Sequence, residues 1–188
     1  MANEVLQKVG TQIIFADHGT DFIGGASGTS LEVAGTDVQI DLTSIATTAA
    51  RNSVQVDLGA TRARQYSVMA AIEMAASVVA GTVVTLYWAP SPNSTAGNGN
   101  PGGASGTDAA YTGTAASTVA ESVLQLQRIG VFVCTDDATG TVQVATVGVF
   151  SPQERYGSLV VVNNTAVSTH SDAVETHIVF NPIVDEVQ

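Results

Sequence analysis

The sequence predicts an all-β protein, an antiparallel β-sandwich of jelly-roll type with eight or nine strands. Several segments alternate apolar and polar residues with a period of two, which is typical of half-buried antiparallel strands. Val and Ile favour strands, and 18 glycines supply turns. Glu, Lys and Arg are scarce, which disfavours a helix-rich protein, although the many alanines are an exception.

A chain of 188 residues fits a single domain, with or without an arm. Residues 31–188 are predicted to form the sandwich, and residues 1–30 an N-terminal arm or a first strand region. The segment 11–16 reads TQIIFA and suits a short strand. The Gly/Ser/Thr-rich stretch that follows contains the isolated apolar residues Phe22 and Ile23, as in an extended arm. A frayed terminus is the alternative.

The first strands of the sandwich are expected at 38–42 and 54–58, where apolar residues stand at alternate positions. The residues expected to face the core are Val38, Ile40, Leu42, Val54, Val56 and Leu58. Segment 65–88 is predicted to be a β-hairpin with its turn at 79–82, and a helix at 68–80 is the alternative. The second strand is expected to end at Pro90 and Pro92, because proline cannot donate to a ladder.

Residues 91–113 contain one aromatic residue, Tyr111, and one charged residue, Asp108. Because this segment has so few large side chains, we expect it to contribute nothing to a core. The loop, which extends to about residue 118, is longer than most connections, and such loops tend to be functional or disordered. We therefore expect a long Gly/Ser/Asn-rich surface loop.

Four more strands are expected in the second half of the chain. The first carries Gly130, which marks a bulge, and the third is apolar on both faces. Their ranges are 122–135, 141–151, 158–166 and 174–187, with a turn at 136–140.

The net charge is −11, from 17 acidic and 6 basic residues. Duplex nucleic acid is therefore excluded as an expected partner, because phosphate binding needs clustered basic residues. Only Arg62 and Arg64 stand close together. The acidity favours solubility, and an acidic face for a basic partner is the alternative.

The single cysteine, Cys134, cannot form an internal disulfide, which fits a reducing compartment. The N-terminus lacks a secretory pattern. The most apolar stretch, 68–90, contains Glu73 and Gly81, so we interpret it as buried strands and expect no membrane partner.

No catalytic residues, cofactor or metal are predicted, and the chain is expected not to be an enzyme. Cys134 lies in an apolar strand and suits the core. A metal site could be assembled from residues near the C-terminus, but their spacing matches no zinc signature. These residues are His170, Asp172, Glu175 and His177.

Tyr87 and Trp88 are neighbours on one expected strand, so they face opposite ways and one of them is expected in the core. The other, together with Tyr111, could form an aromatic platform for a sugar or a protein partner. The interpretation that we favour is that Trp88 lies in the core and Tyr87 at a partly exposed edge.

Residues 65–113 resemble proteins encoded among the virion structural genes of tailed bacteriophages. The resemblance rests on a strand, a turn with AGT, a strand ending in YWAPS and a Gly/Asn/Ser loop ending near DAAYTG. It implies a capsid decoration or cement protein, or another head- or tail-associated component. No catalytic residues come with it.

The expected function is therefore that of a structural virion protein. It would be made in the host cytoplasm and would bind the outer surface of a phage head, bridging capsid subunits. Its partners would be the major capsid protein and copies of itself, as a dimer or trimer. A tail or head–tail connector component and a carbohydrate-binding module are the alternatives. The apolar residues expected to anchor partners are Phe15, Phe22, Ile23, Tyr111, Ile183 and Val184.

Overall fold

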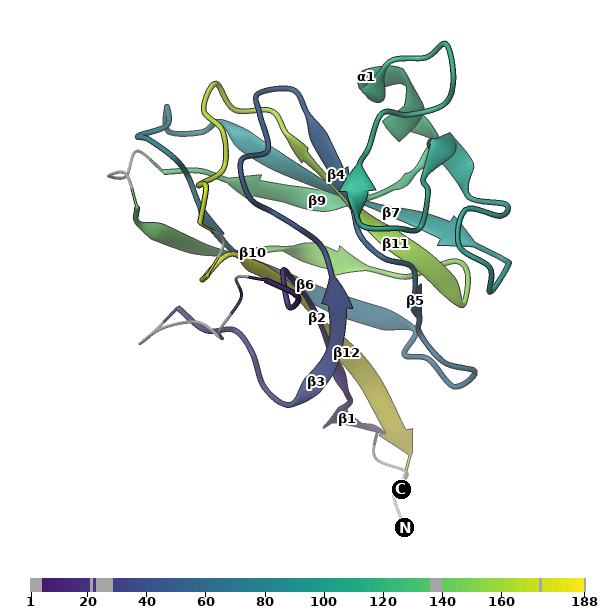
Figure 1. The fold of residues 1–188 in the computed structure, drawn as a ribbon. Coiled ribbons are helices and arrows are strands. Elements are labelled where there is room, and N and C mark those ends of the chain that lie inside the picture. The colour runs from purple at the N-terminus through teal and green to yellow at the C-terminus, as the bar shows by residue number, and fades with distance from the viewer. Residues whose placement is uncertain (1–4, 21, 23–28, 136–139, 173, 188) are drawn as a thin grey trace.

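The computed structural model describes residues 5–20, 22, 29–135, 140–172 and 174–187. These residues form twelve strands in two facing sheets, more than the eight or nine expected (Figure 1). The all-β prediction is confirmed. No helix among these residues is long and apolar enough to cross a membrane.

The first sheet, sheet A, follows the spatial order β10-β6-β12-β2-β3, with β1 beside β12. Its strands are β10 (Val142–Phe150), β6 (Gln65–Glu73), β12 (His177–Val187), β2 (Gln12–Ala16), β3 (Gly35–Gln39) and β1 (Val5–Val9). Neighbouring strands are antiparallel except for β2 and β3, which run parallel. Residues 5–9 and 12–16 therefore form strands that belong to sheet A.

The second sheet, sheet B, follows the order β8-β4-β11-β7-β9, with β5 beside β11. Its strands are β8 (Ala109–Ala110), β4 (Ala50–Asn52), β11 (Tyr156–Asn163), β7 (Val83–Ser91), β9 (Gln127–Val133) and β5 (Val56–Asp57). All its neighbours are antiparallel. A register shift in the pairing of β7 with β9 leaves Ile129 as an extra residue beside Gly130, where the sequence predicts a bulge.

The hairpin predicted at 65–88 is wrong, although both of its strands exist. β6 pairs with β10 and β12 in sheet A, whereas β7 pairs with β11 and β9 in sheet B. The connection crosses between the sheets and buries Met74 and Val78 in the core. A helix at 68–80 is excluded as well.

Two further expectations need correction. Val54 is 39% exposed and lies between the short strands β4 and β5, whereas Val56 and Leu58 face the core. β7 continues through Pro90, which pairs with Gly157, and ends at Ser91.

The main core lies between the sheets and contains a cluster of aromatic rings. Phe180 is central, with ring centroids 4.7 Å from Phe15, 5.0 Å from Phe150 and 5.9 Å from Trp88. Cys134 is buried in this core. A second apolar cluster lies on the other face of sheet B. β11 contributes to both clusters, with Leu159 and Val161 in the first and the intervening residues in the second, which explains why it is apolar on both faces.

Candidate interaction site

The anchor residues predicted from the sequence do not gather on one surface. Phe15 is fully buried, and Tyr111 is 3% exposed. Both are therefore core residues, and the prediction that they anchor a partner is wrong. Phe22 packs against two histidines, His18 at 5.3 Å and His177 at 5.1 Å between ring centroids. Ile23 lies outside the described residues.

Ile183 and Val184 are half-buried, and both lie in the last part of β12. Ile183 pairs with Val9 of β1 on one side and Gln65 of β6 on the other. Val184 pairs with Lys8 of β1 alone. These two residues therefore mark the place where β12 leaves the sandwich body.

The expectation that Trp88 lies in the core and Tyr87 is only partly exposed is confirmed, and the alternative aromatic platform is not formed. Trp88 is fully buried in the main core, and Tyr111 belongs to the second cluster. Tyr87 is partly buried and packs against that second cluster. The three rings therefore share no exposed face for a sugar.

The residues considered as metal ligands are also separated. His177 is fully buried on β12, whereas His170 lies in the preceding loop with Nδ1 3.5 Å from Glu73 Oε1. Among the described residues, no group of three or more His, Cys, Asp or Glu could hold a metal ion.

His177 instead holds the segment around Leu31 and Val33, which lies between β2 and β3, against the outer face of sheet A. Its Nε2 accepts a hydrogen bond of 2.9 Å from the Leu31 amide, so Nδ1 carries the proton and donates to Glu175 O at 2.7 Å. Gln12 also binds this segment, donating to Leu31 O and accepting from the Val33 amide. Burial lowers the pKa of His177 below its ordinary value of 6.5, which keeps the ring neutral for this role.

Residues 92–126, between β7 and β9, form a folded lobe that packs on the outer face of sheet B (Figure 1). The expectation that this part of the chain contributes nothing to a core is wrong. The lobe residues in the second cluster are Ala104, Tyr111, Val123 and Leu126. The lobe also contains the strand β8 and the short helices η1 (Pro101–Gly103), α1 (Val119–Ser122) and η2 (Val123–Gln125).

Tyr111 binds the lobe to sheet B and also connects two parts of the lobe. Its amide donates to Ala50 O at 2.8 Å, and its hydroxyl donates to Gly102 O at 2.5 Å. Two glycines allow the lobe chain to close upon itself, because a Cβ on Gly103 would lie 2.6 Å from the carbonyl oxygen of Gly113. Gly103 also has a φ of +72°, which favours glycine.

Asp108 fixes the other side of the lobe. Its carboxylate accepts hydrogen bonds from Arg51 Nε at 2.7 Å, the Asp41 amide at 3.0 Å and Gln39 Nε2 at 3.3 Å. Burial raises the pKa of Asp108, but these hydrogen bonds outweigh it and hold the pKa below the ordinary value. The sequence reasoning missed this contact, because Asp108 and Arg51 stand 57 positions apart.

The tip of the lobe, residues 92–99, is exposed but held in place. Ser91 Oγ lies 3.1 Å from Asn93 O and 3.0 Å from Asn98 O, and the Thr95 amide donates to Asn93 Oδ1 at 2.8 Å. The tip therefore presents small side chains and backbone groups on a fixed frame.

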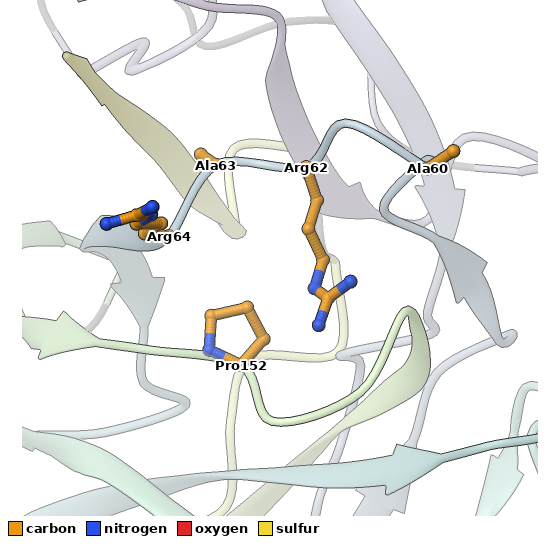
Figure 2. Close-up of a pocket in the computed structure, with 5 residues that line it drawn as sticks. All are labelled: Ala60, Arg62, Ala63, Arg64 and Pro152. Atoms are coloured by element: carbon orange, nitrogen blue, oxygen red, sulfur yellow. The ribbon is translucent and has the colours of Figure 1, made fainter.

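Arg62 and Arg64 line a shallow hollow of about 300 Å³ before β6, together with Ala60, Ala63 and Pro152 (Figure 2). Figure 2 shows Arg62 reaching down beside Pro152 and Arg64 on the other side of the hollow. Arg62 Nη2 donates to Gln153 O at 3.3 Å, and neither guanidinium forms an ion pair with a described residue. Guanidiniums that have no ion-pair partner among the described residues can bind a carboxylate or phosphate.

No protein-family model matches this chain. Neither a curated protein nor a solved structure shows significant similarity to it.

Proposed function

We propose that the protein is a structural virion protein, a capsid decoration or cement protein that binds the outer surface of a phage head. It stabilises the shell by bridging neighbouring capsid subunits and performs no catalysis. The proposal starts from the resemblance of residues 65–113 to phage virion proteins. In the structure these residues form β6, β7 and most of the lobe, including its tip.

The fold that we propose for this role is a jelly roll. Four strands of sheet A follow the order β2-β12-β6-β10, and four of sheet B follow β4-β11-β7-β9. Numbered one to eight along the chain, these strands lie in the orders 1-8-3-6 in sheet A and 2-7-4-5 in sheet B, so only the fourth and fifth are consecutive within one sheet. This is the order of two interlocked Greek keys, and jelly rolls are common in viral capsid domains. The remaining strands β1, β3, β5 and β8 are additions at the edges.

The observation that carries the proposal is the lobe tip at 92–99, which is exposed yet fixed by hydrogen bonds. Ordering a flexible loop on binding costs conformational free energy, and a loop that is already ordered avoids most of that cost. Small side chains let backbone groups approach a partner closely. Because the chain carries a net charge of −11, the partner surface is expected to be basic.

Phage shells that lack the protein provide the test. Purified protein should co-sediment with these shells and raise their melting temperature. Ser94→Arg at the tip should weaken co-sedimentation at least tenfold, whereas the control Val79→Arg, at an exposed position in the β6–β7 connection, should not. Absence of binding by the wild-type chain would refute the proposal, and binding only at the tail or portal would assign it to a connector.

A further inference from the structure

The last part of β12 and the whole of β1 form a two-stranded extension, which we call the terminal ribbon (residues 5–9 and 183–187). The register runs from Val9 opposite Ile183 to Val5 opposite Val187. On the other side of β12, pairing with β6 stops at Ile183 opposite Gln65. Figure 1 shows the ribbon leaving the body of the sandwich.

Both edges of the ribbon are open among the described residues. β1 pairs only with β12, and β12 beyond Ile183 pairs only with β1. A two-stranded ribbon is marginally stable by itself in water, and its unpaired N–H and C=O groups are a template for further strands. The ribbon contains no proline or glycine that would block pairing.

The joint at the base of the ribbon is tightly packed. A Cβ on Gly10 would lie 2.7 Å from Pro182 Cγ and 3.2 Å from a methyl carbon of Val184. Gly10 connects β1 to β2, and Pro182 is the residue of β12 that precedes the ribbon. The close contact sets the direction in which the ribbon leaves the body.

The charges on the two strands indicate which strand would be added. β1 carries the basic residue Lys8, and the ribbon part of β12 carries the acidic residues Asp185 and Glu186. Pairing β12 with β12 of another copy would set acidic strands side by side, and pairing β1 with β1 would do the same with lysines. Pairing the β12 edge of one copy with the β1 edge of the next places opposite charges together.

We propose that copies of this protein associate head to tail through the terminal ribbon, the β12 edge of one copy pairing antiparallel with the β1 edge of the next. Such a contact joins two different surfaces, so each copy still has one free surface after it binds a neighbour. A closed assembly of this kind is therefore a ring. Two ribbons would make a four-stranded barrel, too narrow for inward side chains, so the ring holds at least three copies.

Sedimentation of the purified 188-residue chain tests the proposal directly and needs no capsid. The wild-type protein should have a mass at least three times that of the 19.2 kDa chain. Lys8→Glu should raise the dissociation constant of the assembly at least tenfold and so shift the population toward monomer. Adding Glu186→Lys to that variant should restore the ring. Arg128→Glu, an equal charge change at an exposed position on β9, is the control and should leave the mass unchanged.

Cross-linking distinguishes this arrangement from a two-fold dimer. A mixture of Gln7→Cys and Asp185→Cys chains, both in a Cys134→Ser background, should give cross-linked pairs, whereas neither variant alone should. Cross-links within the Asp185→Cys population alone would overturn the head-to-tail contact. A wild-type mass of one or two chains at about 100 μM would also overturn it. Because these measurements involve no shell, their failure is distinct from failure of the proposed capsid role.

Discussion

Gly157 on β11 shows how closely one residue can control the packing of the core. A Cβ at this position would lie 2.3 Å from Trp88 Cζ2 and 2.8 Å from the Ala89 carbonyl oxygen. Trp88 cannot move aside, because its ring is fully buried against Phe150 and Phe180. Glycine is required here by the close approach of the indole to the backbone.

Gly157→Ala should therefore lower the free energy of unfolding by about 1–3 kcal/mol, the usual cost of overpacking a core. Urea unfolding followed by Trp fluorescence measures the change. Gly19→Ala is the matched control: its nearest neighbour would be Gln39 Oε1 at 3.5 Å, and its effect should stay within about 0.5 kcal/mol. Equal stability of the two variants would contradict the packing argument.

His177 should make stability fall with acid. Its pKa is lowered in the folded state, chiefly by burial, and Glu32 and Glu175 oppose this while His18 adds to it. Below about pH 6.5 the unfolded chain gains a proton at this position that the folded chain does not. Stability should therefore be unaffected by this residue above pH 7 and decline as the pH falls from 6.5, by at most about 1.4 kcal/mol per pH unit.

Urea unfolding at several pH values between 5 and 7.5 measures this slope. His177→Gln should be less stable at neutral pH, because the bond from the Leu31 amide is disturbed. Its stability should depend less on pH in this window. A slope equal to that of the wild type would show that another group carries the acid sensitivity.

At the scale of elements, the lobe depends on a few contacts that are distant in sequence. Tyr111→Phe removes the hydrogen bond to Gly102 O and should cost about 1 kcal/mol. Tyr111→Ala also opens a cavity in the second cluster and should cost about 3–5 kcal/mol. Unfolding curves give the two values, and amide exchange should show faster opening of residues 92–126.

Tyr87→Phe is the control for the hydroxyl, since Tyr87 packs against the same cluster and its hydroxyl forms no hydrogen bond with a described residue. Its stability should match that of the wild type. If Tyr111→Phe behaved like Tyr87→Phe, the hydroxyl would not hold the lobe.

The strand segments themselves could be predicted well, and their pairing could not. The alternation in 141–151 and the apolar run in 158–166 locate β10 and β11 to within a few residues. The same patterns led to a hairpin at 65–88 that does not exist. A period of two reports that a strand has one buried face, but it does not report which strand lies beside it.

At the scale of the whole molecule, the two sheets are built mainly from contacts between distant parts of the chain. β2 at the N-terminus pairs with β12 at the C-terminus, where Phe15 stands opposite Ile178. Phe15 is among the residues expected from the sequence to anchor a partner. Phe15 is buried because β12 pairs beside it and sheet B packs over it. The residues next to Phe15 in the sequence do not predict either contact.

Composition and periodicity by themselves determined the all-β class, the positions of most strands and the apolar character of both faces of β11. These depend on local propensity and on which residues avoid water. Only the tertiary structure decided that 92–126 is a folded lobe, that Tyr111 and Trp88 are buried, and that the terminal ribbon leaves two edges open. Burial and open edges depend on which distant segments of the chain contact one another. Local sequence patterns do not predict those contacts.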